Sequence, residues 1–192
     1  METMIYVVRH GQTLFNIKHL IQGKGDSPLT EKGIAQAYHL RSVLQKISFD
    51  LGVSSTSERA RDTMHIILDG RCPYAYYKEL KEISFGTLEG DPVSAAFEKS
   101  EDEDLWIPKQ KDFTAYGGDN FSQAREKAEE KLIEIGRKHP GQTLLVVSHG
   151  ALLKELFSHL DPNFKERVPN CSVSQLTYSH QHLSLIRPPE VL

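Results

Sequence analysis

Two short segments of the sequence each place a histidine and a glycine directly after an apolar run. Residues 9–11 read Arg-His-Gly after the run 5–8, and residues 148–150 read Ser-His-Gly after the run 143–147. Such runs predict strands that are buried on both faces, and open α/β sheets bind ligands where their strands end. Glycine also lets a ligand approach the backbone closely. We therefore expect one site in which a bound anion lies beside an imidazole.

Two arginines are candidates for holding the anion. Arg9 lies in the first of these turns, and Arg59 falls in the first turn of a helix predicted after a strand over residues 49–54. Unpaired backbone donors and the helix dipole favour an anion there, and residues 55–57 add three hydroxyl groups. Guanidinium groups offer forked donors that match phosphate oxygens, and His149 is a third donor. The hydroxyl-rich cap and Arg59 are therefore interpreted as a second phosphate-binding element.

The nucleophile is assigned by elimination among the residue types that attack phosphorus. No cysteine lies in an anion-binding turn, no serine has an evident base, and no aspartate pair or zinc-ligand spacing indicates a metal site. An imidazole that forms a phosphohistidine remains, with no metal and no cofactor. His10 is favoured over His149 because it lies between an arginine and a glycine. Its second ring nitrogen should donate to a fixed acceptor such as a backbone carbonyl.

A general acid must protonate the alkoxide that leaves. Residues 79–90 predict a loop that carries three carboxylates, Glu79, Glu82 and Glu89. Glu82 is preferred, because burial beside a substrate phosphate would favour the protonated form of its carboxyl, which could later activate water. On spacing alone, Glu79 and Glu89 stay open as alternatives.

Length and composition indicate one globular domain over residues 1–192. Hydrophobic residues make up 39% and charged residues 26%, values ordinary for a folded domain. The net charge of −3 gives no general attraction to nucleic acid or to anionic membranes, so a small-molecule partner is expected. No export signal and no membrane-spanning stretch is visible, which favours a cytoplasmic location with Cys72 and Cys171 as free thiols.

The remaining pattern alternates strands and helices. Helices are predicted over residues 31–47, over 121–138, and from residue 150 onward. The first of these should bury an apolar face made of Ile34, Ala37, Tyr38, Leu44 and Ile47, interrupted only by Arg41. Thr13, Thr30 and Asn120 are placed to cap helices. Further strands are expected near 73–77, 171–178 and 182–186. The irregular segment 91–118, with a short helix near 93–97, is interpreted as a cap whose aromatic residues either cover the site or form a satellite core.

Seven motifs occur in an order that resembles the histidine phosphatase family, also called phosphoglycerate mutase-like. They are RHGQTLFN at 9–16, QG with DSPLTEKG at 22–33, SS with ERA at 54–60, EISFGTLEG at 82–90, GGDNF at 117–121, SHGALLKEL at 148–156 and NCSVS at 170–174. The resemblance implies a three-layer α/β/α sandwich with a mostly parallel sheet, helices on both faces and a small cap.

The resemblance also implies a role for individual residues. His10 matches the phosphorylated histidine, and Glu82 matches the catalytic carboxylate, which decides among the three candidates. The matched phosphate ligands are Arg9, Asn16, Arg59 and His149, with lesser contributions from Gln22, Gly23 and Gly150. Departures occur at Ser57, where an apolar residue is usual, at Asp62, where glutamine is common, and at Asp119-Asn120, which replaces a usual Glu-Ser.

Other polar residues are interpreted as ordinary surface groups. Lys24 and Arg61 are expected to be solvated charges, and the acidic run 98–104 a solvated face. No role is expected for the remaining histidines, which are His19, His39, His65, His139, His159, His180 and His182.

The sequence therefore predicts a metal-independent phosphomonoester hydrolase that acts through phospho-His10 on a small phosphorylated metabolite. A mutase is the nearest alternative, but family members of that kind carry an arginine-rich cap insertion, whereas the cap here has only Lys99, Lys109 and Lys111 as cations. A phosphate-binding module without activity would be expected to lack the nucleophile or the acid, and both are present. Oligomeric state is left open, with a homodimer as one option.

Overall fold

The computed structural model describes residues 1–99 and 106–192 of the chain. Its main sheet has six strands in the order β3-β2-β6-β1-β7-β8. The strands are β1 (Thr3–Arg9), β2 (Leu51–Ser55), β3 (Tyr74–Tyr77), β6 (Thr143–Ser148), β7 (Val173–Ser179) and β8 (His182–Glu190). The helices are α1 (Leu14–Ile17), α2 (Glu31–Leu44), α3 (Glu58–Leu68), α4 (Phe121–Lys138) and α5 (Gly150–Leu160). The predicted α/β class is confirmed.

Parallel pairing in the middle of the sheet brings the two histidine turns together. Strands β1, β6, β2 and β3 pair in parallel, and β7 adds to β1 in the antiparallel sense, followed by β8. Along β1 and β6 the register pairs Val8 with Val147 and Arg9 with Ser148. Because the two strands run in the same direction, His10 and His149 leave the sheet at the same edge.

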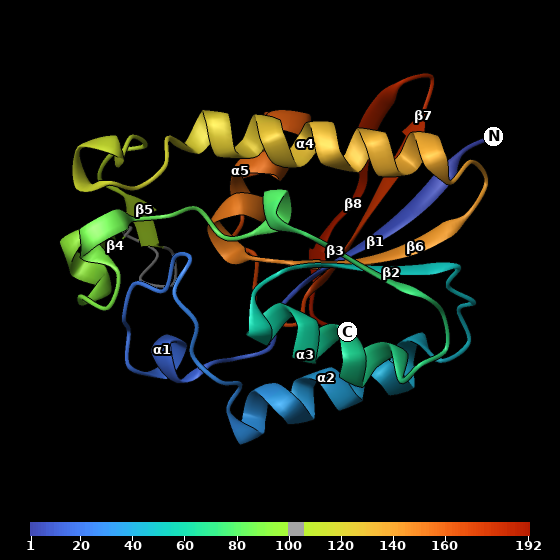
Figure 1. Ribbon diagram of the computed structural model, residues 1–192, viewed down its shortest axis with the longest axis horizontal. Helices are drawn as coiled ribbons and strands as arrows, with labels where there is room; N and C mark the ends of the chain where they lie inside the picture. Colours follow the sequence, from blue (N-terminus) through green and yellow to red (C-terminus); the bar gives the residue numbers. More distant parts are fainter. Residues whose placement is uncertain (100–105) are drawn as a thin grey trace.

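Helices cover both faces of this sheet, with α4 and α5 on one side and α2 and α3 on the other (Figure 1). Side chains along β1 alternate between the two layers, since Ile5 and Val7 pack in the core with α4 and α5 whereas Val8 packs with α2 and α3. In β6, Leu144 and Leu145 divide in the same way. This two-residue alternation explains why both strands read as unbroken apolar runs.

The predicted buried face of α2 is correct in part. Ala37 and Leu44 are buried as expected, whereas Ile34 and Tyr38 are 40% and 54% exposed, and Gly33 and Leu40 are the other buried positions. Gly33 sets this face, because a Cβ atom there would lie 2.1 Å from the carbonyl oxygen of Gln12. The start of α2 therefore packs directly against the turn that follows β1, and the helix ends at Leu44 rather than at residue 47.

Side-chain caps begin three helices at the predicted residues. Thr13 and Asn16 form a reciprocal capping box at α1, Thr30 accepts from the backbone of Gly33, and Asn120 accepts from that of Gln123. Because α1 is only four residues long, its capping box supplies a large share of its hydrogen bonds. The first of these caps also fixes Asn16 near His10.

The cap matches the prediction in part. The short helix predicted near 93–97 is present as a 3₁₀ helix over Val93–Ala95, and it leads into β4 (Phe97–Lys99), which pairs with β5 (Trp106–Pro108) and was not predicted. Phe113 is 1% exposed, and its ring centroid lies 5.0 Å from that of Phe85 and 5.8 Å from that of Phe121. Phe113 therefore belongs to the main core and ties the cap to the sheet domain.

Candidate active site

His10 follows the last residue of β1 and is 2% exposed. Its Nδ1 lies 2.8 Å from the carbonyl oxygen of Gly11, which can only accept a hydrogen bond, so Nδ1 carries the proton and Nε2 keeps its lone pair. The carbonyl partner expected from the sequence is therefore present. Burial first, and then the positive charges of Arg59 and Arg9, hold the pKa of His10 well below its ordinary value.

His149 follows β6, and its ring centroid lies 5.2 Å from that of His10. Its Nε2 is 2.7 Å from the hydroxyl oxygen of Ser55, at the end of β2. The ring is fully buried, and burial followed by the charge of Arg59 holds the pKa of His149 well below its ordinary value. This contact of Ser55 was not predicted, because nothing local in the sequence links two residues that are 94 positions apart.

Arg9 reaches from the end of β1 toward the start of α5. Its Nη1 donates to the carbonyl oxygen of Val168 at 2.7 Å. Gly150 makes room for the guanidinium, since a Cβ atom there would lie 3.0 Å from Cζ of Arg9. Gly150 therefore contributes by its lack of a side chain, and burial lowers the pKa of Arg9.

Arg59 is 1% exposed and is held by three acceptors of one loop. Its Nη1 donates to the carbonyl of Gly25 and to the carboxylate of Asp26, both at 2.8 Å, and its Nη2 donates to the carbonyl of Gly23 at 2.9 Å. Gly23 has a φ of +51°, and a Cβ atom there would lie 2.2 Å from the Glu89 carboxylate. Only glycine fits this position, which shows why the loop needs it.

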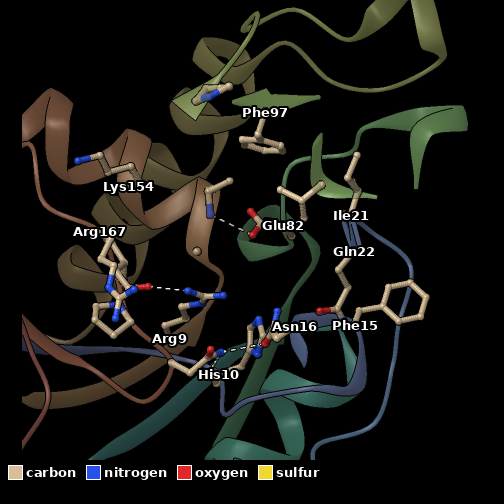
Figure 2. A pocket seen from close by; sticks show the side chains of 18 of the residues that line it. Arg9, His10, Phe15, Asn16, Ile21, Gln22, Glu82, Phe97, Lys154 and Arg167 are labelled. Carbon is tan, nitrogen blue, oxygen red and sulfur yellow. Dashed lines mark hydrogen bonds between the residues drawn. The ribbon is translucent and has the colours of Figure 1, made fainter. Parts of the chain in front are cut away.

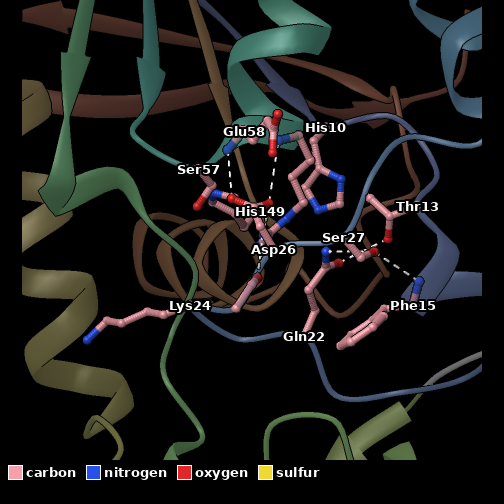
Figure 3. Close-up of polar contacts among 12 residues, drawn as sticks. His10, Thr13, Phe15, Gln22, Lys24, Asp26, Ser27, Ser57, Glu58 and His149 are labelled. Atoms are coloured by element: carbon pink, nitrogen blue, oxygen red, sulfur yellow. Dashed lines mark hydrogen bonds and ion pairs between the residues drawn. The ribbon is translucent and has the colours of Figure 1, made fainter.

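The hydroxyl-rich cap predicted before Arg59 is not formed. Ser57 occupies the N-cap position of α3, but its side chain makes no capping bond. Asp26 serves instead, because its carboxylate accepts from the backbone N–H of Glu58 at 2.7 Å while it pairs with Arg59 (Figure 3). Acceptors of the protein therefore already bind the backbone N–H groups at the start of α3, which leaves the Arg59 side chain as the group that could bind an anion there.

Unpaired buried donors gather around His10. Within residues 1–99 and 106–192, the buried side-chain nitrogen and oxygen atoms that lack a hydrogen-bond partner are Nε of Arg9, Nε of Arg59, Nδ1 of His149 and Oγ of Ser57. Three of these four belong to residues that the sequence predicts as phosphate ligands. Buried polar groups are otherwise almost always paired, so this concentration of donors is suited to an anionic ligand.

Two amide side chains are oriented by their neighbours. Oδ1 of Asn16 accepts from the backbone of Thr13 and from Nδ2 of Asn170, which also donates to the carbonyl of His10. Gln22 accepts from the hydroxyl of Thr13 and donates to that of Ser27 (Figure 3). Asn170 was not predicted, although it opens the NCSVS motif just before β7.

Glu82 lies on the opposite side of the pocket from His10, at the first turn of α5 (Figure 2). Its carboxylate accepts from the backbone N–H groups of Ala151 at 3.0 Å and Leu152 at 2.9 Å, and from that of Ile83 at 3.0 Å. A carboxylate in this position is fixed, faces the pocket and can exchange a proton with a ligand.

The two rival carboxylates serve other purposes. Glu89 accepts from the backbone of Lys24, Gly25 and Phe85 and from the hydroxyl of Ser84, so it joins the loop that holds Arg59 to the loop that holds Glu82. Glu79 lines a separate cavity of about 140 Å³, whereas Glu82 also lines the main pocket. The geometry therefore favours Glu82 for chemistry.

The main pocket has a volume of about 740 Å³. Arg9, His10, Asn16, Gln22 and Glu82 line it (Figure 2). Arg59, Gly23 and Gly150 are further lining residues. Its other walls are formed by residues that the sequence did not single out, among them Phe15, His19, Ile21, Phe97, Lys154 and Arg167. In the part of the chain that the structure describes, no cluster of three or more His, Cys, Asp or Glu residues is arranged to hold a metal ion.

Several residues expected to be ordinary have ordinary surroundings. Lys24 pairs with Asp119 at 2.8 Å, and the Arg61 guanidinium lies 5.2 Å from the ring centroid of Tyr76.

Both cysteines are free thiols, as predicted. The acidic run 98–104 extends into residues 100–105, which lie outside the described residues. No helix in the described ranges is long and apolar enough to cross a membrane.

Residues 5–188 match the family described as the histidine phosphatase superfamily, branch 1. The chain belongs to this superfamily. The match spans both histidine turns, the Arg59 helix and the Glu82 loop, so the family resemblance of the ordered motifs is confirmed.

Relatives within the superfamily carry different activities in their names. The chain is 33% identical to the adenosylcobalamin/alpha-ribazole phosphatase of Salmonella typhimurium, over 81% of this chain and 78% of that protein. It is 30% identical to the probable phosphoglycerate mutase GpmB of Erwinia tasmaniensis, over 91% and 84%. Among solved structures, Bacillus stearothermophilus YhfR superposes with a TM-score of 0.84 at 28% identity, covering 99% and 98% of the two chains.

Replacing Asp26 tests the long-range cap of α3. Asp26→Ala is expected to lower the free energy of unfolding by about 1–2 kcal/mol, because the backbone N–H of Glu58 and the guanidinium of Arg59 both lose the carboxylate that accepts from them. Asp26→Asn should recover part of this loss, since an amide oxygen can still cap the helix. Ser57→Ala is the matched control and should leave stability unchanged or raise it, because the Ser57 hydroxyl is buried without a partner. Urea unfolding measures all three, and a larger loss for Ser57→Ala would refute the assignment.

The surroundings of the two histidines predict the acid limb of the pH profile. Their pKa values lie well below 6.5, so both rings stay neutral and His10 stays nucleophilic as the pH falls through 6.5. The fall in kcat/KM that protonation of His10 causes is therefore expected only below pH 6.5. Two phosphate esters that ionise at different pH values separate this limb from ionisation of the substrate. A limb that stays above pH 6.5 with both esters would contradict a neutral His10.

Proposed function

We propose that this protein hydrolyses phosphate monoesters of small metabolites through a phosphohistidine on Nε2 of His10. The observation that carries the proposal is the cluster of unpaired buried donors on Arg9, Arg59 and His149 around an imidazole whose Nδ1 is already committed to Gly11. A phosphoryl group bound there meets positive charge on its oxygens and a lone pair at phosphorus. The same arrangement without the nucleophile would bind a phosphate ester but would not cleave it.

The first step breaks the ester bond. Nε2 of His10 donates its lone pair to phosphorus, the bond to the alcohol oxygen breaks, and Glu82 in its protonated form gives its proton to the leaving alkoxide. Arg9, Arg59 and His149 bind the phosphoryl oxygens throughout, with Asn16 and Gln22 at the margin.

The second step regenerates the enzyme. Glu82, now ionised, accepts a proton from a water molecule as the water attacks phosphorus, and the bond to Nε2 breaks with its electron pair returning to His10. The backbone N–H groups of Ala151 and Leu152 bind the ionised carboxylate that this step requires. Inorganic phosphate then leaves.

Hydrolysis is preferred over mutase chemistry because of the pocket wall beyond the phosphate. A phosphoglycerate mutase must hold a carboxylate-bearing intermediate between two transfers, which calls for spare cations. Here Phe15, Ile21 and Phe97 give that region an apolar wall. Lys111 pairs with Glu155 at 2.8 Å, and Lys154 already donates to the carbonyl of Glu166. Lys32 and Arg167 line the pocket as well, so the preference for hydrolysis rests on the apolar wall.

Trapping the intermediate tests the nucleophile. Rapid quench with a labelled phosphate ester and chelator present should give protein-bound phosphate that is labile in acid and stable in base, and His10→Ala should abolish both the label and turnover. His19→Ala is a control, because His19 lines the same pocket yet is exposed. An acid-stable label would instead identify a hydroxyl nucleophile. Conversion of 3-phosphoglycerate in the presence of 2,3-bisphosphoglycerate would support the mutase alternative.

Comparing leaving groups tests Glu82. Glu82→Gln should slow hydrolysis of alkyl phosphates by about 10²–10⁴-fold, because an alkoxide needs a proton as it leaves, and should slow phosphohistidine formation from p-nitrophenyl phosphate far less. Single-turnover kinetics isolate this step from the later attack by water. Glu79→Gln is the matched control, since Glu79 lies outside the main pocket. Equal slowing of both esters would remove Glu82 from the acid role.

A further inference from the structure

Ser55 makes one of the most enclosed polar contacts at the site. Its hydroxyl oxygen lies 2.7 Å from Nε2 of His149, and both residues are fully buried. Ser55 ends β2 and His149 follows β6, its parallel neighbour, so two strands of the sheet hold the contact from both sides. Nothing in the proposed reaction makes Ser55 touch the substrate.

The direction of this hydrogen bond follows from the other partner of the hydroxyl. Oγ of Ser55 also accepts from the backbone N–H of Ser57 at 3.2 Å. The hydroxyl proton still needs an acceptor, and among the described residues Nε2 of His149 is the one within hydrogen-bond distance. If Nε2 carried a proton instead, the hydroxyl proton would be buried without a partner, at a cost in stability. Ser55 therefore donates and His149 accepts.

A neutral imidazole has a single ring proton, so an accepting Nε2 places that proton on Nδ1. Nδ1 of His149 is buried and has no partner among the described residues. The ring lies next to His10, at 5.2 Å between centroids (Figure 3). An N–H group on this nitrogen has no protein acceptor among the described residues, and a phosphoryl group bound at the neighbouring His10 would supply one.

We propose that Ser55 is a positioning residue that holds His149 in the Nδ1–H tautomer, so that this neutral ring donates a hydrogen bond to the phosphoryl group. The role of the His149 Nδ1–H group in binding a phosphoryl group rests on the proposed phosphatase reaction, whereas the assignment of the tautomer does not. Without the Ser55 hydroxyl, the ring is free to place its proton on Nε2 and to turn an acceptor lone pair toward the negative phosphoryl oxygens.

The tautomer can be measured directly in the full chain. Nitrogen-15 NMR of histidine-labelled protein distinguishes protonated from unprotonated ring nitrogens, with His149 identified by its loss in His149→Asn. The expected result is a protonated Nδ1 and a bare Nε2 at neutral pH, and a change at Nδ1 when inorganic phosphate is added. A protonated Nε2 would overturn the proposal, and this measurement needs no variant of Ser55.

Substitutions then connect the tautomer to turnover. Ser55→Ala is expected to shift the His149 proton toward Nε2 and to lower kcat by about 10–100-fold. This is the range found when a metal-bound histidine loses the hydrogen-bond partner that fixes its tautomer, and we expect an effect of the same order here. Ser55→Thr keeps the hydroxyl and should restore both. Ser54→Ala is the matched control, because Ser54 is equally buried but its hydroxyl donates to the carbonyl of Ser55.

The outcomes separate this inference from the proposed function. If Ser55→Ala keeps the Nδ1–H tautomer and the wild-type kcat, Ser55 has no positioning role even though the enzyme hydrolyses phosphate esters. If the protein hydrolyses none of them but Ser55→Ala moves the His149 proton, the function is wrong and the role of Ser55 in setting the tautomer stands. A uniform loss in Ser55→Ala and Ser54→Ala, with the tautomer unchanged in both, indicates packing alone and contradicts the proposal.

Discussion

The parallel pairing of β1 with β6 is the constraint on which the site depends. Its register sets Arg9 level with Ser148, so the residues that follow, His10 and His149, leave the sheet together with ring centroids 5.2 Å apart. Both rings are buried at the sheet edge beside two arginines, and burial first, followed by the positive charge of the arginines, holds the pKa of each ring well below its ordinary value and keeps the imidazole neutral. An imidazole must be neutral to attack phosphorus. The sheet register therefore also determines the protonation state, because it places both rings where they are buried.

A second set of contacts keeps the buried Arg59 in place. Arg59 is buried against two carbonyls and one carboxylate of the loop 22–27, and that loop is joined to the Glu82 loop through the carboxylate of Glu89. Removing Arg59 from water without these acceptors would be costly, since a buried charge needs partners. The loop therefore positions the cation and the acid relative to each other, although neither Asp26 nor Glu89 reaches the reacting atoms.

The sequence predicted the parts of the site that are encoded locally. Apolar runs fix β1 and β6, glycines mark the turns after them, and Thr13, Thr30 and Asn120 cap the helices that they precede. It could not predict contacts between distant segments. The cap of α3 comes from Asp26 and not from the adjacent Ser57. At the start of α2, Gly33 packs on Gln12, and there the buried position is Gly33 and not the predicted Ile34. Spacing also left Glu79 and Glu89 open as alternatives to the preferred Glu82, because the packing of the Glu82 carboxylate on the start of α5 joins segments that are far apart in the sequence.

The two histidines illustrate how one tautomer can serve opposite purposes. In His10 the proton on Nδ1 is used by the carbonyl of Gly11, which leaves a lone pair on Nε2 for attack. In His149 the hydroxyl of Ser55 occupies Nε2, which leaves an N–H group on Nδ1 for binding. Each ring is set by a neighbour that touches only its far nitrogen, so the chemistry of the near nitrogen is decided before any ligand arrives. A cationic His149 would also donate a hydrogen bond, but it would add a third positive charge beside Arg9 and Arg59 in a buried space. Donation without charge binds the phosphoryl oxygens and leaves His10 nucleophilic.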